Sequence, residues 1–226
     1  MIQELIAITL EIETIEKTLS IVELIKSGGF AGQLIIALLT FLLIVTLYIY
    51  FERLLTIKSA SKVDPNFMNE IKDYVVNGNF DAAKVLCMNV NSPVSRLIHK
   101  GVSRIGRPLA DINSSIENAG KLEVYSLEKN ISVLATISGA APMIGFLGTV
   151  IGMILSIFEI ANSGGQIDIK LLADGLYTAM TTTVGGLVVG IIAYISYNHI
   201  VGRTNKVVYQ MEANSVEFLD LLNEPT

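Results

Sequence analysis

Threonines inside two uncharged stretches are the residues of this chain that could do chemistry. Thr178, Thr181, Thr182 and Thr183 lie within two helical turns, and Thr149 lies in a separate apolar stretch. Hydroxyl groups can orient water or a proton-bearing group, but they do not titrate near neutral pH. They can equally bond back to a carbonyl of their own helix. The pattern fits either a polar passage or close helix packing, and both hold if several copies pack around a passage.

Small residues accompany these threonines at helical spacing. Gly145, Thr149, Gly152 and Ser156 recur at intervals of four, three and four residues, so they share one helix face. Small side chains let helices approach closely inside a membrane. A proline at the start of this helix also removes one backbone donor. The candidate packing residues of the two stretches are Pro142, Gly145, Gly148, Gly152, Gly185 and Gly186.

The apolar stretches contain no charged residue except at their edges, where Glu52, Glu159 and Asp174 lie. A proton path across a bilayer needs a titratable carrier at depth. If this protein conducts protons, the carboxylate must therefore belong to another subunit. The sequence argues against a self-sufficient proton pump.

Composition places these stretches in a membrane protein. Of the 226 residues, 51% are hydrophobic and 16% are charged, whereas soluble domains are about 25% charged. Residues 31–51, 131–158 and 174–201 are each long enough to cross a bilayer as a helix. We predict an all-α membrane protein with three transmembrane helices, two of which extend far beyond the bilayer.

The remaining segments are predicted to be helical and partly polar. Residues 1–26 form an amphipathic helix, residues 52–130 a small helical domain, residues 159–173 a loop and residues 202–226 a C-terminal helix. Asp64-Pro65, Ser92-Pro93 and Gly106-Arg107-Pro108 divide the helical domain. From about Asp111 no proline or paired glycine interrupts the pattern, which predicts one unbroken helix into the second span.

Lysine and arginine are distributed unequally between the two sides of the membrane. Residues 52–130 and 202–226 carry nearly all of them, and the opposite side keeps Lys17, Lys26 and Lys170. This bias predicts that the N-terminus lies outside and the C-terminus in the cytoplasm. Cys87 is then in a reducing compartment and should be a free, inert thiol.

The sequence offers no motif of an enzyme or of a nucleic-acid-binding protein. A single cysteine and two distant histidines, His99 and His199, provide no metal-ligand spacing. There is no nucleophile motif or phosphate-binding loop, and the basic residues follow the topology rather than forming a patch. We expect no enzymatic activity, no cofactor, no metal and no nucleic-acid partner.

Two motifs resemble the ExbB/TolQ/MotA proton-channel family, and ExbB and TolQ in particular. Ala141 to Gly152, APMIGFLGTVIG, resembles the family signature AP-x-x-GLLGTV-x-G. Gly175 to Leu187, GLYTAMTTTVGGL, resembles G-I-x-E-A-L-x-T-T-x-x-G-L. Tyr197-Asn198-His199, Glu52-Arg53 and the three spans also fit. The resemblance covers nearly the whole chain beyond residues 1–26.

This resemblance implies a motor subunit of the bacterial inner membrane, with a periplasmic N-terminus. Such subunits form a homo-oligomer, typically a pentamer, around an ExbD-like single-span dimer whose aspartate carries the proton. A TonB-like protein passes the motion to outer-membrane transporters. By position, Thr149 and Thr183 would face the pore, and Thr178 and Thr182 are further candidates for the proton pathway.

One position departs from the family pattern, because the family's glutamate in the third span falls on Thr178. Three explanations remain open: Thr178 with water replaces the glutamate, Asp174 serves at the entrance, or coupling differs in this branch. Two other functions also remain open. One is a TolQ-like motor for envelope maintenance, and the other is a scaffold whose small faces only pack helices. A MotA-like motility stator fits less well, since that branch has four spans.

Overall fold

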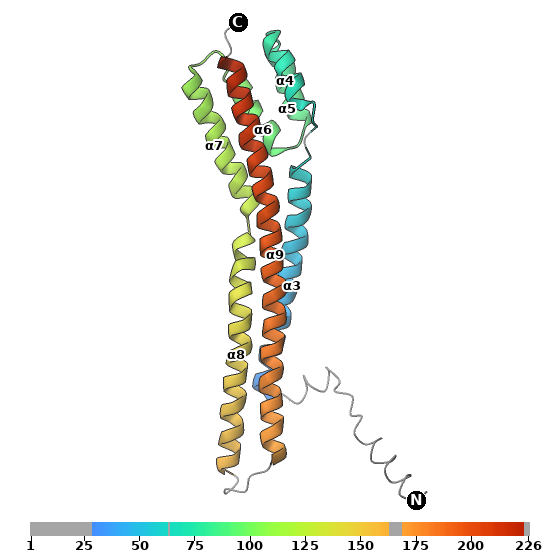
Figure 1. Cartoon of the computed structure of the whole chain (residues 1–226), viewed down its shortest axis with the longest axis vertical. Helices are drawn as coiled ribbons and strands as arrows, with labels where there is room; N and C mark the ends of the chain where they lie inside the picture. Colours follow the sequence, from blue (N-terminus) through green and yellow to red (C-terminus); the bar gives the residue numbers. More distant parts are fainter. Residues whose placement is uncertain (1–28, 63, 163–168, 224–226) are drawn as a thin grey trace, which may run out of the picture. The chain divides into compact units, whose positions relative to one another are not determined.

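The computed structural model describes residues 29–62, 64–162 and 169–223, and the predicted helix over residues 1–26 lies outside them. Every regular element among the described residues is an α-helix (Figure 1). The helices are α3 (Gly29–Ala60), α4 (Phe67–Val76), α5 (Phe80–Asn89), α6 (Pro93–Val102), α7 (Leu109–Glu128), α8 (Ile131–Asn162) and α9 (Ile169–Asn223).

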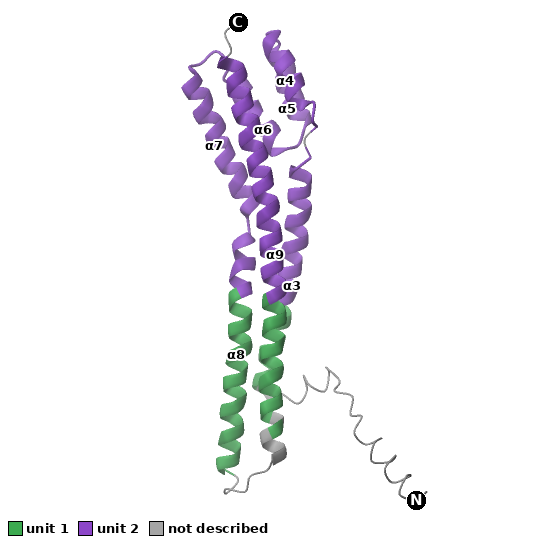
Figure 2. Ribbon diagram, in the orientation of Figure 1, with its two compact units in different colours: residues 1–42, 139–190 green, residues 43–138, 191–226 purple. Residues whose placement is uncertain are grey.

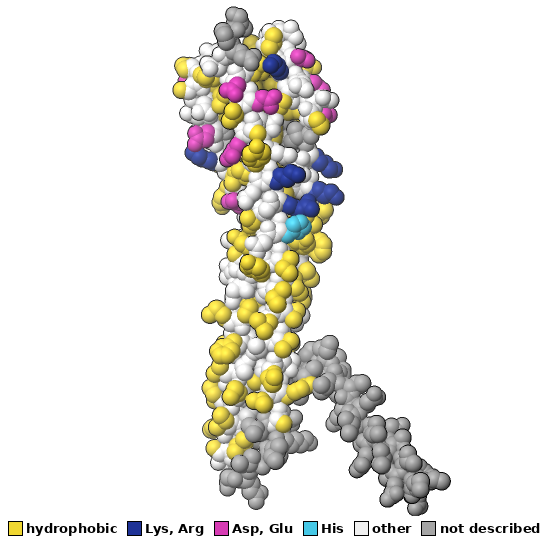
Figure 3. All heavy atoms as spheres, in the orientation of Figure 1, with side chains coloured by type: hydrophobic (Ala, Val, Ile, Leu, Met, Phe, Trp, Pro, Cys, Tyr) yellow, Lys and Arg dark blue, Asp and Glu magenta, His cyan; other side chains and the backbone are white. Residues whose placement is uncertain are grey.

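Three segments are long and apolar enough to cross a membrane: Ala31–Ala60, Leu109–Asn162 and Gly175–Asn223. Large hydrophobic side chains such as Phe41, Phe146 and Ile195 are more than half exposed on them, as expected for helices solvated by lipid. Figure 3 shows hydrophobic side chains over α8, while charged side chains gather over α7 and the C-terminal part of α9. The chain is an all-α, multi-pass membrane protein, as the sequence predicted.

The chain divides into two compact units, shown in different colours in Figure 2. The first unit contains the described residues up to Leu42 and Gly139–Gly190, which are parts of α3, α8 and α9. The second unit contains Leu43–Ser138 and the described residues from Ile191 onward, including all of α4 to α7.

The second unit has a core of large apolar side chains. Ile71, Ile98 and Phe218 from α4, α6 and α9 are each fully buried in it. The ring of Phe218 lies over Gly101, where an added Cβ would be 2.5 Å from the ring. Helix α6 begins with a capping box: Ser92 and Ser95 each accept the other's backbone N–H, which satisfies two otherwise unpaired donors.

Cys87 belongs to the same core, where it is buried and free. Burial raises the pKa of its thiol to about 12, because an apolar environment disfavours the thiolate. The side chain is therefore a protonated, weakly nucleophilic thiol at neutral pH.

The predicted unbroken helix from Asp111 into the second span is wrong. Helix α7 ends at Glu128, and α8 begins at Ile131. Lys129 leaves the helical conformation with ψ of 130°, and Asn130 is left-handed with φ of 63°. Asparagine tolerates this conformation better than most residues, so the chain breaks the helix without the proline or glycine that the prediction required.

The predicted loop over residues 159–173 is wrong at both ends, because residues 159–162 and 169–173 are helical. Helix α8 continues to Asn162, and α9 is already helical at Ile169. Helix α3 likewise continues past residue 51 to Ala60, and the third span and the C-terminal segment form the single helix α9. Within residues 159–173 the sequence supplies a strong breaker only at Ser163-Gly164-Gly165, which explains why the helices extend into this segment from both sides.

Candidate functional site

Helices α8 and α9 touch backbone to backbone in the first unit. A Cβ added to Gly186 would lie 2.5 Å from the carbonyl oxygen of Ala141 and 2.8 Å from the Cα of Gly145. A Cβ added to Gly145 would lie 2.7 Å from the carbonyl oxygen of Thr182. No side chain fits at these distances, so only glycine permits this approach.

Thr149 of α8 and Thr183 of α9 meet where the helices are this close. Thr149 Oγ1 lies 3.1 Å from the carbonyl oxygen of Ala179, and Thr183 Oγ1 lies 3.2 Å from that of Gly145. The two hydroxyls are also hydrogen-bonded to each other. Both residues are half-buried. The structure thus places together the two threonines for which the family resemblance implied one shared role.

Thr182 and Thr178 lie in the interior of the unit instead. Thr182 is fully buried, donates to the carbonyl oxygen of Ala179 at 2.8 Å, and sits where a Cβ on Gly148 would be 2.4 Å from its hydroxyl. Thr178 is 6% exposed, and its methyl group would lie 2.9 Å from a Cβ on Gly32 of α3. Within one subunit, these two side chains therefore pack between helices.

The close packing of α8 against α9 continues to Ser156 and Gly175. Ser156 donates to the carbonyl oxygen of Gly152 at 2.8 Å, and a Cβ on Gly175 would lie 1.5 Å from the Ser156 hydroxyl. Gly175 and Gly32 are thus packing residues that sequence reasoning missed. Gly175 lay in the quoted motif and could have been found. No motif around Gly32 indicated its contact with Thr178, because that contact depends on the rotation of α3.

Three further residues were predicted for the site. Gly185 makes only an ordinary contact, 3.6 Å between its added Cβ and Leu39. Pro142 lies inside α8 and is half-buried. Asp174 is within α9, but its side chain lies outside what the structure describes.

A polar cluster in the second unit joins α3 to α9. Tyr50 Oη lies 2.9 Å from His199 Nδ1, and Arg203 Nε donates to His199 Nε2 at 2.9 Å. A guanidinium has only donors, so His199 Nε2 accepts this hydrogen bond. Nearby, the buried side chain of Arg53 donates to the carbonyl oxygen of Ser126 at 3.1 Å.

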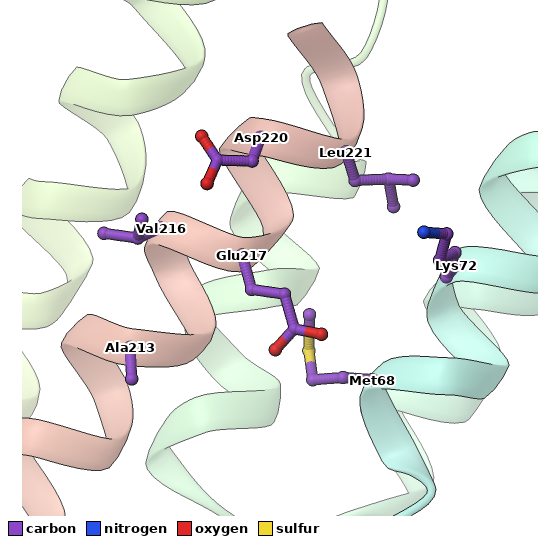
Figure 4. Close-up of a pocket in the computed structure, with 7 residues that line it drawn as sticks. All are labelled: Met68, Lys72, Ala213, Val216, Glu217, Asp220 and Leu221. Atoms are coloured by element: carbon purple, nitrogen blue, oxygen red, sulfur yellow. The ribbon is translucent and has the colours of Figure 1, made fainter. Parts of the chain in front are cut away.

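The second unit also has a shallow pocket of about 290 Å³ between α4 and α9. Figure 4 shows Met68 and Lys72 extending from α4, while Glu217 extends from α9 toward Met68. Seven residues of α4 and α9 line this pocket: Met68, Lys72, Ala213, Val216, Glu217, Asp220 and Leu221. Across the part of the chain that the structure describes, no three His, Cys, Asp or Glu side chains form a metal-binding group.

The chain is similar to known proteins over the region that contains Thr149 and Thr183. The model of the MotA/TolQ/ExbB proton channel family matches residues 89–213. A Methanothermobacter thermautotrophicus protein described as a biopolymer transport protein ExbB homolog is 27% identical over 85% of this chain and 67% of its own. The biopolymer transport protein ExbB of Aquifex aeolicus is 36% identical over 48% of this chain and 74% of its own.

The match also extends to the Tol branch of these proteins. The Tol-Pal system protein TolQ of Haemophilus influenzae is 34% identical over 38% of this chain and 37% of its own. An ExbB-like protein of Helicobacter pylori is 39% identical over 39% of this chain. The chain spans only 57% of that H. pylori protein's length.

Proposed function

We propose that this chain, which belongs to the MotA/TolQ/ExbB proton channel family, is the channel and stator subunit of a motor in the bacterial inner membrane. In this role the proton motive force energises transport at the outer membrane. The partners are an ExbD-like single-span protein, which supplies the proton-carrying aspartate, and a TonB-like protein.

The contact between Thr149 and Thr183 is the observation that carries this proposal. It joins two apolar helices by hydroxyl groups that are half-buried and tied to the facing backbone. Hydroxyls can bind and orient a carboxyl group, but they cannot replace it as a proton carrier. The spans contain no carboxylate away from their edges. A channel that is complete only with a partner's carboxyl group explains both features.

The topology in this proposal has a periplasmic N-terminus and a cytoplasmic C-terminus. The unequal distribution of lysine and arginine supports it, since positive residues favour the cytoplasmic side. Several copies, with five as the family's typical number, surround the partner helices. Large exposed side chains on α8, such as Met143, Phe146 and Ile154, need lipid or a neighbouring copy to cover them. The proposal assigns the chain no enzymatic activity.

A TolQ-like motor for envelope maintenance is the second candidate, and the match to the Haemophilus influenzae TolQ supports it. A non-conducting scaffold is the third candidate. The backbone contact between Gly145 and Gly186 supports this candidate, because such a contact packs helices whether or not protons move.

The test begins with the complex purified from native membranes. Native mass spectrometry should find several copies of this chain with a single-span protein that carries an aspartate in its span. Proteoliposomes of the complex should then pass protons when a membrane potential is applied. Loss of flux on Thr149→Val, with the complex still assembled, supports a channel.

The scaffold predicts a different order of events. In that case Thr149→Val reduces assembly first, and the wild-type complex passes no protons. The matched control is Thr40→Val in α3, since the Thr40 hydroxyl donates to Ile36 of its own helix at 2.8 Å. Deletion of the gene separates the two motor functions. Loss of outer-membrane uptake indicates an ExbB-like function, and loss of envelope integrity indicates a TolQ-like function.

A further inference from the structure

Tyr50, His199 and Arg203 of the second unit form a chain of hydrogen bonds that ends in an exposed guanidinium group. Tyr50 Oη lies 2.9 Å from His199 Nδ1, and Arg203 Nε donates to His199 Nε2 at 2.9 Å. Among the residues that the structure describes, the terminal nitrogens Nη1 and Nη2 of Arg203 have no protein partner. The bond to His199 therefore orients the guanidinium and leaves its outer donors available to a ligand.

Further exposed cations lie on the same two helices. Lys206 follows Arg203 by three residues and shares its face of α9. Lys58 lies on α3, which packs beside α9 here, because Ile57 and Val207 belong to one buried cluster. Figure 3 shows Lys and Arg side chains gathered next to a histidine, where the hydrophobic cover of the helices ends.

Carboxylates do not offset this positive charge. Residues 191–211 of α9 contain no Asp or Glu, and residues 43–62 contain only Glu52. The Glu52 carboxylate is already paired with the guanidinium of its buried neighbour Arg53. The exposed cations are therefore suited to an anion, and an oriented guanidinium is suited to a phosphate group in particular.

Exposed apolar side chains precede these cations on both helices. Tyr48 and Phe51 of α3, and Tyr194 and Ile195 of α9, are each more than half exposed. Tyrosine is typical of the membrane interface. Arg203 follows Ile195 by eight residues, about 12 Å along a helix. Lipid chains that cover the apolar side chains would thus place their phosphate groups beside the cations.

We propose that the junction of α3 and α9 in the second unit binds the headgroup phosphate of an anionic phospholipid. Arg203 is the central ligand, because its planar donors match two phosphate oxygens. Lys206 and Lys58 add positive charge, and their long side chains can extend along the helices to the headgroup. Tyr50 and His199 are positioning residues that hold the guanidinium. The proposal does not depend on proton transport.

The charge and the apolar surface together select the class of ligand. A free phosphate ion would use the cations and leave the apolar side chains uncovered. A zwitterionic phospholipid would cover the apolar side chains, but its ammonium group gains nothing from a site built of cations. An anionic phospholipid uses both features, since each basic residue near the membrane surface attracts it.

The test measures lipid binding by the full chain, purified in detergent and stripped of lipid. Phosphatidylglycerol, phosphatidylcholine with the same acyl chains, and inorganic phosphate are added in turn. Native mass spectrometry counts the bound lipid, and thermal denaturation reports the stabilisation that binding provides. We expect phosphatidylglycerol to bind at least about fivefold more tightly than phosphatidylcholine, the scale of one basic residue at an anionic surface. Inorganic phosphate should cause no shift.

Arg203→Gln should weaken the binding of phosphatidylglycerol at least about fivefold. Because Arg203 is exposed, its lipid-free denaturation should resemble that of wild type. Arg203→Lys keeps the charge without the planar group, so its affinity should be intermediate. The matched control is Arg107→Gln, which removes an exposed arginine from the turn before α7. Arg107 lies about 30 Å along α7 from the end that Arg53 contacts, so the control should bind like wild type.

Two substitutions of His199 test the positioning role. His199→Gln keeps a side-chain oxygen that can accept from Arg203, so it should retain most of the preference for phosphatidylglycerol over phosphatidylcholine. His199→Leu removes the acceptor and should lower this preference. A change in general stability would affect the binding of both lipids equally, whereas loss of the oriented guanidinium changes their ratio.

Different results overturn different parts of the proposal. Arg203→Gln that binds phosphatidylglycerol like wild type overturns the site, and so does an equal loss in Arg107→Gln, because net charge would then suffice. Equal binding of phosphatidylcholine overturns the selection of an anionic lipid. A shift with inorganic phosphate as large as that with phosphatidylglycerol shows a site for free anions instead. An unchanged lipid preference in His199→Leu overturns the positioning role of His199.

Discussion

The two units of this chain are held together in different ways. In the first unit, Gly145 and Gly186 bring two helix backbones into contact, and hydroxyls bond across to the facing carbonyls. In the second unit, large apolar side chains such as Ile98 and Phe218 fill the space between helices. The first arrangement leaves no room for added atoms, and the second is sensitive to atoms removed.

This difference agrees with lipid around the apolar spans of the first unit and water around the more polar helices α4 to α7 of the second unit. Between helices in lipid, large apolar side chains gain little from contact, because lipid tails are just as apolar. Close backbone approach and interhelical hydrogen bonds then provide the specificity. Where water surrounds the helices, burial of large side chains stabilises the fold at roughly 25 cal/mol per Å². We therefore expect the first unit to be destabilised most by substitutions that add atoms, and the second unit by substitutions that remove them.

Gly186→Ala should have the largest effect of the substitutions considered. Its Cβ would lie 2.5 Å from a backbone oxygen, so the helices would have to separate. The cost should exceed the roughly 1–3 kcal/mol of ordinary overpacking, because backbone cannot move aside as a side chain can. Gly185→Ala is the matched control, since its Cβ meets only Leu39 at 3.6 Å.

The measurement is the amount of assembled complex in detergent and its thermal denaturation. Gly186→Ala should abolish assembly or lower the transition strongly, and Gly185→Ala should assemble like wild type. Equal behaviour of the two variants would contradict the backbone contact between α8 and α9.

Phe218→Ala should be the most damaging truncation in the second unit. Phe218 is fully buried against Gly101, and removal of such a ring costs about 3–5 kcal/mol. Tyr209→Ala in the same helix is the control, because Tyr209 is 72% exposed. Cys87 lies in the same core, so its rate of alkylation should rise in Phe218→Ala and remain slow in Tyr209→Ala.

Much of the first unit's chemistry could be predicted from sequence, because its signals are local. The uncharged stretches predicted the spans, and the spacing of Gly145, Thr149 and Gly152 predicted a small, close-packing face. The absence of carboxylates from the spans leads us to expect dependence on a partner, and this stays a prediction. The assignment of the threonines to a pore stays a prediction, since it concerns an assembly of several chains.

The roles of individual threonines could not be separated from sequence alone. Thr178, Thr182 and Thr183 lie within two helical turns, and which of them faces α8 depends on the rotation of α9. That rotation is fixed by tertiary contacts, including Thr178 against Gly32 of α3. The break at Asn130 was missed for a related reason: asparagine permits a left-handed turn but does not require one.

Thr178→Glu should have an intermediate effect on the first unit. It restores the residue type of the family pattern, but the side chain is 6% exposed and already meets α3. The larger side chain should cost about 1–3 kcal/mol through overpacking. Thr178→Ser, which is smaller, should be better tolerated. Thermal stability and proton flux of the assembled complex test this order, and a fully active Thr178→Glu would show that α3 can yield there.

Ser92→Ala should have the smallest effect, and it tests whether the second unit also depends on hydrogen bonds. The serine caps α6 by accepting the backbone N–H of Ser95 at 3.1 Å. Loss of such a cap costs about 1 kcal/mol, well below the loss of a core ring. Ser114→Ala on an exposed face of α7 is the control and should be neutral. A cost for Ser92→Ala equal to that of Phe218→Ala would mean that capping, rather than the apolar core, dominates this unit.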